Sequence, residues 1–180
     1  GQPLLVSGEY GTGRTAVALY AYAHSPRGAH PLAEVDCGML SATSREFLLN
    51  STRSPLFAHD VTLHVKDLSR GDDDFLRRLL STIVQSGATR RGCVILSCNP
   101  RHEIVSRYLP LIKDSLLCLE LRLMPLRDRR ESIPSLANLY LNQLNCELAG
   151  DVMRIDTRAV QLLVDYPWPG NLLQMERVVR

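Results

Sequence analysis

The sequence predicts an α/β protein, in which helices cover a parallel sheet and a small helical subdomain follows. Short apolar runs alternate with segments of helical periodicity through the first two thirds of the chain, a pattern typical of parallel strands joined by helices. A glycine-rich loop links the first apolar run to the first helical segment. From Met124 onward the composition changes, and only helical patterns follow a charged segment.

Five apolar runs are the expected strands, which makes the sheet five-stranded. They cover Leu4–Ser7, Leu32–Asp36, Val61–Val65, Cys93–Ser97 and Leu117–Leu121. Helices are expected over Thr15–Ala23 and Phe75–Val84, because apolar residues recur there at helical spacing. We expect helices on both faces of the sheet.

Three carboxylates in the run Gly71-Asp72-Asp73-Asp74 stand directly before the second of these helices. Side-chain oxygens at this position accept hydrogen bonds from first-turn amides, and negative charge is stabilised by the helix dipole. We therefore expect this run to cap the helix, in preference to binding a metal.

A domain boundary is expected between residues 123 and 124. The core then covers 1–123 and the helical subdomain 124–180, with helices near Ser132, near Asp156 and after Gly170. The charged residues 127–131 are expected to form a solvated hinge with local ion pairs. Because the chain begins in an apolar run and ends in a helical pattern, we expect a piece of a longer protein.

The composition excludes several classes of protein. Of 180 residues, 45% are hydrophobic and 22% charged, as in ordinary globular domains. The net charge of +2 is too small to indicate a nucleic-acid or membrane surface, and no apolar run reaches the roughly 20 residues that span a bilayer. The five cysteines lack paired spacing, which favours reduced thiols. We expect a cytoplasmic protein without membrane contact.

The glycine-rich loop has the spacing of a phosphate-binding loop. It matches the pattern G-x-x-x-x-G-K-[ST] except that Arg14 replaces the lysine. Such a loop offers backbone amides and a helix N-terminus to a phosphate, and a hydroxyl to Mg²⁺. It predicts ATP or ADP as ligand, with Thr15 as the Mg²⁺ ligand. The expected cofactor-binding residues in the loop are Gly8, Glu9, Tyr10, Gly11, Thr12, Gly13, Arg14 and Thr15.

Arg14 keeps the positive charge of the lysine that it replaces. Its planar guanidinium is wider than an ammonium group, so we expect weakened binding. The alternative is a glycine-rich turn that binds no ligand.

Four blocks carry a resemblance to a known family. They are the loop itself, Val35-Asp36-Cys37-Gly38, Met124-Pro125-Leu126-Arg127-Asp128-Arg129-Arg130-Glu131-Ser132-Ile133-Pro134, and Tyr166-Pro167-Trp168-Pro169-Gly170-Asn171. In this order they resemble the AAA+ central domain of bacterial enhancer-binding proteins, the sigma-54-dependent activators of the NtrC family. The resemblance implies a P-loop NTPase fold with a helical lid, self-association into a ring or dimer, and ATP-driven remodelling of sigma-54 RNA polymerase. It also implies DNA binding through a helix-turn-helix domain outside this chain.

The acidic pair of the family is incomplete here. After the third strand the family has adjacent aspartate and glutamate residues for Mg²⁺ and the attacking water, whereas this chain reads Lys66-Asp67-Leu68. Asp67 is therefore the remaining candidate catalytic acid. Asn99, at the end of the fourth strand, matches the family's polar residue there and is the second candidate. Loss of one acid is expected to slow hydrolysis by orders of magnitude.

Three further family features are absent from the sequence. Ser115 stands at the position of the arginine that reaches a neighbouring subunit, and Leu173 replaces the lid's sensor arginine. The hexapeptide G-A-F-T-G-A, which engages sigma-54 in the family, is missing between Cys37 and Thr62. We therefore expect the remodelling of sigma-54 RNA polymerase to be lost, while the sequence leaves open whether the contact with it is retained.

The leading interpretation is a degenerate AAA+ domain that binds nucleotide but hydrolyses it poorly and acts through association and regulation. Arg14 and Lys66 are then hypothesised to neutralise the phosphates without metal, the alternative being that Lys66 faces solvent. A second interpretation is a working ATPase that remodels sigma-54 polymerase with groups from neighbouring subunits or from shifted residues. A small-molecule kinase is disfavoured, because the Pro125 and Trp168 blocks have no role there.

Overall fold

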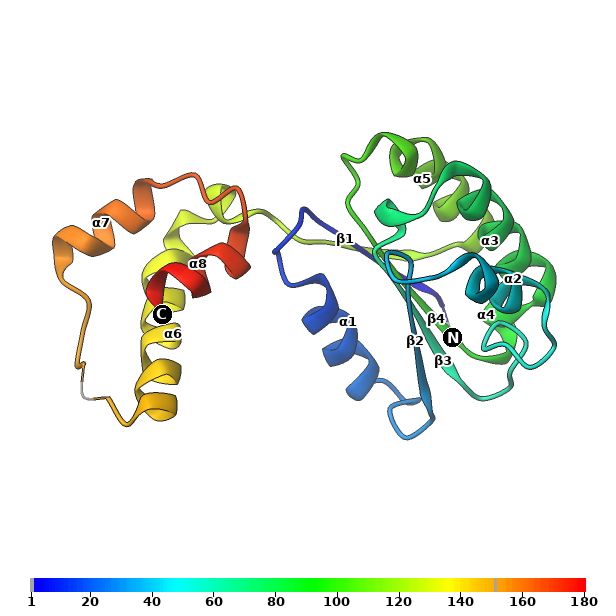
Figure 1. Cartoon of the computed structure of the whole chain (residues 1–180), viewed down its shortest axis with the longest axis horizontal. Coiled ribbons are helices and arrows are strands. Elements are labelled where there is room, and N and C mark those ends of the chain that lie inside the picture. The colour runs from blue at the N-terminus through cyan, green and yellow to red at the C-terminus, as the bar shows by residue number, and fades with distance from the viewer. Residues whose placement is uncertain (1, 151) are drawn as a thin grey trace. The chain divides into compact units, whose positions relative to one another are not determined.

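The computed structural model describes residues 2–150 and 152–180 and contains one five-stranded parallel sheet (Figure 1). The strand order is β2-β3-β4-β1-β5. The strands are β1 (Leu4–Ser7), β2 (Leu32–Asp36), β3 (Thr62–Lys66), β4 (Cys93–Cys98) and β5 (Leu119–Arg122).

The helices alternate with the strands and then continue alone. They are α1 (Arg14–Ala23), α2 (Ala42–Asn50), α3 (Asp73–Ser86), α4 (Ala88–Arg91), α5 (Glu103–Leu116), α6 (Ile133–Leu148), α7 (Thr157–Asp165) and α8 (Asn171–Val179), with short 3-10 turns at Leu68–Arg70, Leu126–Asp128 and Arg130–Ser132. The predicted fold class, an α/β core with a five-stranded parallel sheet followed by a helical subdomain, is confirmed.

The chain divides into two compact units. One comprises Gly1–Gly8 and Arg14–Arg122 and contains the sheet; we call it the core unit. The other comprises Glu9–Gly13 and Leu123–Arg180; we call it the lid unit. Most of the glycine-rich loop thus groups with the C-terminal helices, which nothing in the sequence indicates.

Within the core unit, parallel pairing places the carboxyl-terminal ends of β1, β3 and β4 at the same end of the sheet. β1 pairs in parallel with β4 and with β5, Ser7 lying opposite Cys98 and Arg122. β3 pairs with β2 and β4, Lys66 lying opposite Asp36. The strand order reverses at β1. The next strand in sequence, β2, lies beyond β4 and β3 on one side of β1, whereas β5 lies on the other side. Open α/β sheets bind ligands beyond the strand ends at such a reversal.

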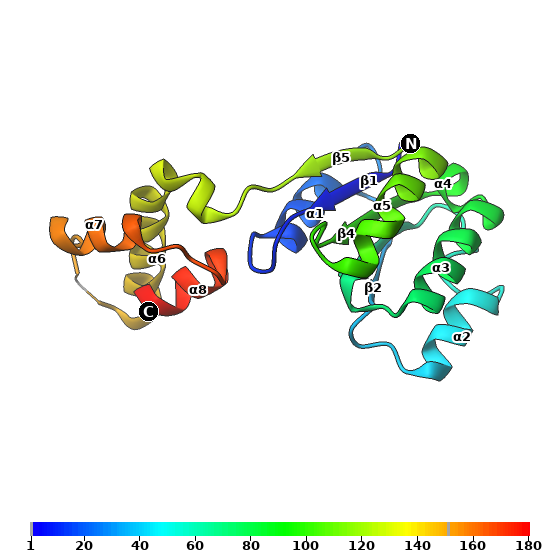
Figure 2. The ribbon, with the colours of Figure 1, turned by 90° about the horizontal axis from the view of Figure 1, so that it is seen from above.

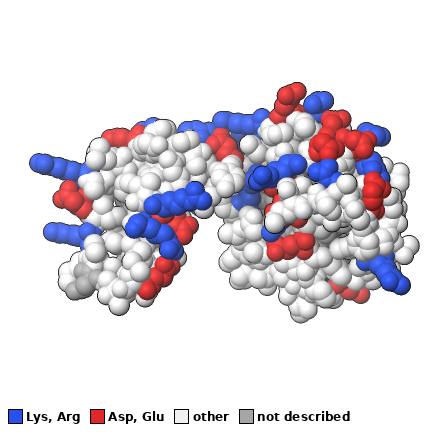
Figure 3. Space-filling model, in the orientation of Figure 1, with Lys and Arg blue, Asp and Glu red and all other residues white. Residues whose placement is uncertain are grey.

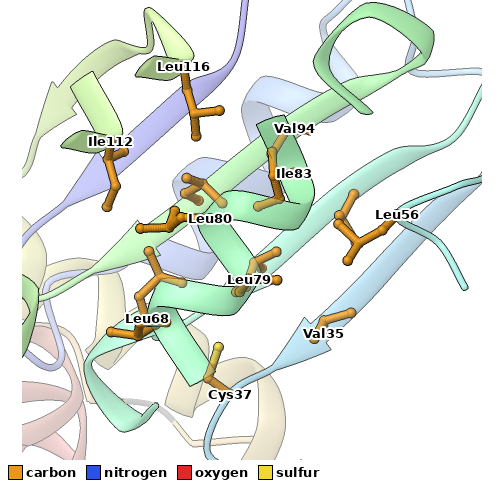
Figure 4. Close-up of a cluster of buried hydrophobic side chains, with 14 of the residues drawn as sticks. Val35, Cys37, Leu56, Leu68, Leu79, Leu80, Ile83, Val94, Ile112 and Leu116 are labelled. Atoms are coloured by element: carbon orange, nitrogen blue, oxygen red, sulfur yellow. The ribbon is translucent and has the colours of Figure 1, made fainter. Parts of the chain in front are cut away.

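The main core lies between one face of the sheet and α3 and α5 (Figure 4). Leu5, Val65 and Leu96 project from this face, while α3 contributes buried side chains at helical spacing. The opposite face is covered by α1, as Figures 1 and 2 show. Its residues Val6 and Ile95 are buried together with Ala18 of α1.

The lid unit has a separate core around Trp168. Its side chain is 1% exposed and contacts a cluster that includes Leu126, Ile133 and Met175. The indole N–H donates to the Leu163 carbonyl oxygen at 2.7 Å, so the one polar atom of the ring is satisfied. The Tyr166–Asn171 block therefore holds the lid helices together.

The expected cap of α3 is confirmed. The side chain of Asp72 accepts a hydrogen bond from the Phe75 N–H at 2.9 Å, and Asp73 and Asp74 lie in the first turn. The helix ends at Gly87, whose φ of +67° suits a residue without a side chain.

Some element boundaries differ from those predicted. β1 and β2 match, but β3 begins one residue later than Val61 and β5 two residues later than Leu117. Leu117 is the C-cap of α5 in the left-handed conformation, with φ of +49°, and so cannot begin the strand. The helices α2, α4 and α5 are not among those predicted, and α5 contains Pro110 in its interior.

The surface carries mixed charge, in keeping with the small net charge. Lys and Arg side chains lie among Asp and Glu side chains on the face seen in Figure 3. Arg78 pairs with Glu46 at 2.6 Å, and Arg45 pairs with Asp72 while lying over the Phe75 ring. Among the described residues, no helix combines the length and the apolar character that a membrane crossing requires.

We predict that Ile83→Ala lowers the free energy of unfolding by about 2–5 kcal/mol, because it leaves a cavity at a side chain that is 0% exposed. The matched control is Val84→Ala on the same helix, which removes apolar atoms from a side chain that is 49% exposed. Its cost is expected to stay below about 1 kcal/mol. Urea unfolding of both variants checks this, and equal losses would contradict the core described here.

Candidate functional site

The glycine-rich loop begins where β1 ends. The Gly8 N–H donates to the Cys98 carbonyl oxygen at 3.1 Å, which extends the pairing of β1 with β4 by one residue. Gly11 and Gly13 follow with φ of +77° and +96°, a region that side chains other than glycine rarely enter. Thr12 is buried, and its hydroxyl and N–H both donate to the Glu9 carbonyl oxygen. The loop is therefore a compact turn that needs its glycines.

Arg14 is the first residue of α1 and links the two strand ends of the core unit. Its side chain is 10% exposed. Nη1 donates to the Gly8 carbonyl oxygen at 3.0 Å, and Nη2 donates to Asp67 Oδ1 at 3.1 Å. The structure thus brings a predicted phosphate-binding residue together with the predicted catalytic acid.

Asp67 directly follows β3 in an unusual backbone conformation. Its φ and ψ are +51° and +60°, in the left-handed region. The Asp67 N–H donates to the Ser97 hydroxyl at 3.1 Å, which ties this residue to the end of β4. Asp67 is therefore held twice: its backbone N–H is bonded to Ser97 and its carboxylate to the Arg14 guanidinium.

Lys66, the last residue of β3, is paired elsewhere. Its Nζ lies 3.5 Å from Glu34 Oε1 on the neighbouring strand. Among the contacts recorded for residues 2–150 and 152–180, none joins Lys66 to Arg14. The hypothesis that these two cations act together on phosphates remains a prediction, and so does the alternative of a solvent-facing Lys66.

His64 shares the carboxylate that Lys66 contacts. Its Nδ1 lies 3.2 Å from Glu34 Oε1, and the ring is completely buried. Because a carboxylate accepts, we assign the proton of the neutral ring to Nδ1, which leaves the buried Nε2 without a partner. Burial lowers the pKa of His64, and the hydrogen bond to Glu34 opposes this shift.

The other predicted site residues have simpler surroundings. Asn99 Oδ1 accepts from the Arg101 N–H at 3.1 Å, so this side chain caps the turn before α5. Thr15 is exposed on the first turn of α1. Within the described chain, no three His, Cys, Asp or Glu side chains are grouped to hold a metal ion. The catalytic role of Asn99 and the Mg²⁺ role of Thr15 remain predictions.

Two contacts of the lid unit were not anticipated, and the first involves Arg127. Its guanidinium donates to both carboxylate oxygens of Glu9, at 2.7 and 2.5 Å. The expectation of a local ion pair is therefore wrong for Arg127, because its partner lies 118 positions away in the phosphate loop. The hydrogen bonds to Glu9 raise the pKa of the Arg127 guanidinium.

The second unanticipated residue is Asn171, the first residue of α8. Its side chain is fully buried. Oδ1 accepts from the Leu126 N–H at 2.9 Å, and Nδ2 donates to the Tyr10 carbonyl oxygen at 2.8 Å. Beside it, the Leu172 N–H donates to the Gly11 carbonyl oxygen at 2.9 Å. Asn171 belongs to a block that the resemblance identified, but no local pattern assigned it a contact with the loop.

Gly11 is required by this packing as well as by its φ. A Cβ atom placed there would lie 2.2 Å from the Gly170 carbonyl oxygen, closer than any real contact. The backbone of the Pro-Gly-Asn segment thus occupies the space that a side chain would need. Gly11 therefore allows the loop backbone to approach the segment that leads into α8.

Comparison with known proteins agrees with this architecture. Residues 1–62 match a family model described as a sigma-54 interaction domain, and residues 127–180 match one described as an AAA+ ATPase lid domain. Both parts of the chain are therefore similar to the AAA+ proteins of the sigma-54 activator group. Both matches lie in the order that the four sequence blocks predict.

Curated relatives of this group align with nearly the whole chain. The regulatory protein AtoC of Escherichia coli K12 is 28% identical over 201 residues, which cover 98% of this chain and 44% of AtoC. The DNA-binding transcriptional regulator NtrC of Rhizobium meliloti is 27% identical over 209 residues, which cover 98% and 42%. The chain therefore spans less than half the length of these relatives.

Solved structures share the fold. NtrX from Brucella abortus, in complex with ATP, has a TM-score of 0.79 at 23% identity, covering 99% of this chain and 44% of NtrX. Domain III of the replication initiation protein DnaA from Thermotoga maritima has a TM-score of 0.61 at 15% identity, covering 98% and 73%. At these identities the likeness establishes the AAA+ fold alone.

We predict that the free energy of unfolding falls as the pH drops below about 6.5, the usual pKa of histidine. The lowered pKa of folded His64 means that the unfolded chain binds a proton first, so stability is highest above the unfolded pKa and is lost toward the folded one. His64→Gln should flatten this slope. Denaturant unfolding between pH 7.5 and 5 measures it, with exposed His59→Gln as the control variant. An unchanged slope in His64→Gln would contradict the assignment.

Proposed function

We propose that this domain binds an adenine nucleotide through residues 8–15, hydrolyses it slowly, and acts by self-association within a longer bacterial transcriptional regulator. The observation that carries the proposal is the loop itself. It follows β1, which lies between β4 and β5 in the sheet, it holds Gly11 and Gly13 at positive φ, and it leads into the N-terminus of α1. First-turn amides of a helix lack intrahelical acceptors and bind anions. That NtrX was solved in complex with ATP and with ADP supports the same ligand class here.

The surroundings of Asp67 support slow hydrolysis. Nucleotide hydrolysis needs a metal to offset developing charge and a group that orients the attacking water. Asp67 is the one acid in the stretch Lys66-Asp67-Leu68, and it is bonded to Arg14. A single carboxylate that already holds a guanidinium is poorly placed to serve both the metal and the water.

Sigma-54 RNA polymerase is the partner that the match of residues 1–62 supports. The doubt about this contact rests on the missing hexapeptide and gains no support from the match. The structure has α2 and a series of turns in the segment concerned, between β2 and β3. Loss of the remodelling activity remains a prediction.

A working ATPase that uses shifted residues is the alternative. The shifted residue that we infer for this role is Arg107 on α5, because its side chain is 58% exposed. In this chain its guanidinium lies 3.5 Å from Asp73 and 3.7 Å from Glu103. Phosphate release at rates of ordinary ATPases, which are on the order of 1 per second or faster, would favour this alternative.

We predict saturable binding of ADP and ATP in calorimetric titration, accompanied by a rise in Tm. Arg14→Ala should weaken binding about tenfold or more, because a charge-assisted hydrogen bond to phosphate is lost. The matched control is Arg158→Ala, which removes the same charge from an exposed position of α7.

The metal dependence of binding separates the two accounts of Lys66. Affinity that survives excess EDTA but falls in Lys66→Ala would support neutralisation of phosphates by Arg14 and Lys66. Affinity that EDTA removes would support an ordinary Mg²⁺-dependent site. Neither heat nor a change in Tm at millimolar nucleotide would contradict the proposed function and leave a domain that binds no nucleotide.

A further inference from the structure

Two successive carbonyl groups of the phosphate loop are bonded to the start of α8. The Tyr10 carbonyl oxygen accepts from Asn171 Nδ2 at 2.8 Å, and the Gly11 carbonyl oxygen accepts from the Leu172 N–H at 2.9 Å. All of these residues belong to the lid unit. The loop backbone is therefore held in place by adjacent residues of one helix terminus.

These contacts also determine where the loop amides point. A peptide unit is planar and trans, so its C=O and its N–H point in opposite directions. When the Tyr10 and Gly11 carbonyls face α8, the N–H groups of Gly11 and Thr12 face away from it. The Thr12 N–H is then used within the loop, since it donates to the Glu9 carbonyl oxygen at 3.4 Å, and the Gly11 N–H is the one of the two that the loop can offer to an anion. Outward carbonyls and inward amides are what an anion-binding turn requires.

The side chain of Asn171 has one orientation that satisfies its neighbours. Oδ1 accepts from the Leu126 N–H, which leaves Nδ2 to donate to Tyr10. A rotation of the amide by 180° would place Nδ2 against a donor and Oδ1 against a carbonyl oxygen. The backbone φ of +51° is one that asparagine tolerates better than most residues. Residue type, burial and conformation thus all suit this contact.

Arg127 holds the beginning of the same loop. Its two hydrogen bonds to Glu9 fix the residue that precedes Tyr10, and 28% of its side chain is exposed. Asn171 and Arg127 together anchor three successive residues, Glu9, Tyr10 and, through the neighbouring Leu172, Gly11.

We propose that Asn171 is a positioning residue, which sets the orientation of the phosphate-loop amides and thereby the affinity for nucleotide without touching the nucleotide. The inference rests on the proposed function. It gives the lid unit a route to the nucleotide that needs no charged side chain, since Leu173 stands where the resemblance expects a sensor arginine. Linkage makes the effect reciprocal, so nucleotide stabilises the contact between loop and lid helices.

The test replaces Asn171 by aspartate in the full chain. Asn171→Asp keeps the acceptor for Leu126 and tolerates the positive φ, but it places a carboxylate oxygen against the Tyr10 carbonyl. The Kd for ADP is expected to rise about tenfold. Without nucleotide, amide hydrogen exchange of residues 9–13 is expected to become faster. A role confined to holding the lid fold would lower Tm and leave both readouts unchanged.

The control applies the same change to another lid asparagine. Asn145 also has both amide atoms bonded to backbone, in its case to Val152, and has no recorded contact with the loop among the described residues. Asn145→Asp should leave the Kd for ADP and the exchange of residues 9–13 at wild-type values. Equal effects of both substitutions would overturn the proposal.

The two readouts separate the proposal from the proposed function. If the wild-type chain binds no ADP, the proposed function fails, and hydrogen exchange alone decides whether Asn171 positions the loop. Unchanged exchange in Asn171→Asp overturns the proposal whether or not ADP binds. If that variant does not fold, Asn171→Gly replaces it, since it removes both side-chain hydrogen bonds of Asn171 and keeps the positive φ. A severalfold rise in Kd and faster exchange at residues 9–13 support the inference, and wild-type values overturn it.

Discussion

The hydrogen bonds of Arg14 to Gly8 and Asp67 decide what chemistry is available at the ends of β1 and β3. The guanidinium is largely buried and bridges a backbone carbonyl and a carboxylate. Removing one partner of such a pair leaves the other without compensation in a poorly hydrated place. A phosphate that approaches Arg14 must therefore compete with Asp67 for the same donors. Phosphate binding to Arg14 would therefore release the Asp67 carboxylate from its hydrogen bond.

The charges of the core unit near these strand ends are balanced before any ligand arrives. Arg14 is matched by Asp67, and Lys66 is matched by Glu34. Lysine at position 66 does not simply replace an acid, since it also neutralises a carboxylate on the next strand. The same Glu34 carboxylate also accepts the hydrogen bond from Nδ1 of buried His64. Changes at these positions are consequently not independent, and a substitution at one alters the partner of another.

Much of the core unit is predictable because its signals are local. The strand runs, the cap at Asp72 and the glycine spacing of the phosphate loop each depend on residues close together in the sequence. Local patterns fail where two structures are compatible with the same residues. Leu117 suits the expected strand but is the C-cap of α5, and Pro110 lies inside α5 although proline usually ends a helix. Single-sequence periodicity contains no information on which of the two outcomes prevails.

The contacts of the loop with the lid helices lie beyond such signals. Glu9 and Arg127 are 118 positions apart, and Tyr10 and Asn171 are 161 apart. An arginine in a charged segment has many possible partners, so surface ion pairs were the reasonable expectation. Asparagine after glycine is equally typical of an ordinary turn. Only the tertiary structure shows that both residues converge on one loop.

The paired charges and the anchored loop together indicate which groups of this site would attract a phosphate most. Because Arg14 and Lys66 are already paired, side-chain charge offers a phosphate less than it would in a site with free cations. The greater share must then come from the backbone amides and the N-terminus of α1, whose attraction depends on orientation more than on charge. The orientation of the Gly11 amide follows from that of the Tyr10 carbonyl, which Asn171 holds, and the neighbouring Gly11 carbonyl is held by the Leu172 N–H. The weaker the side-chain charge at this loop, the more its function depends on the helix that holds its backbone.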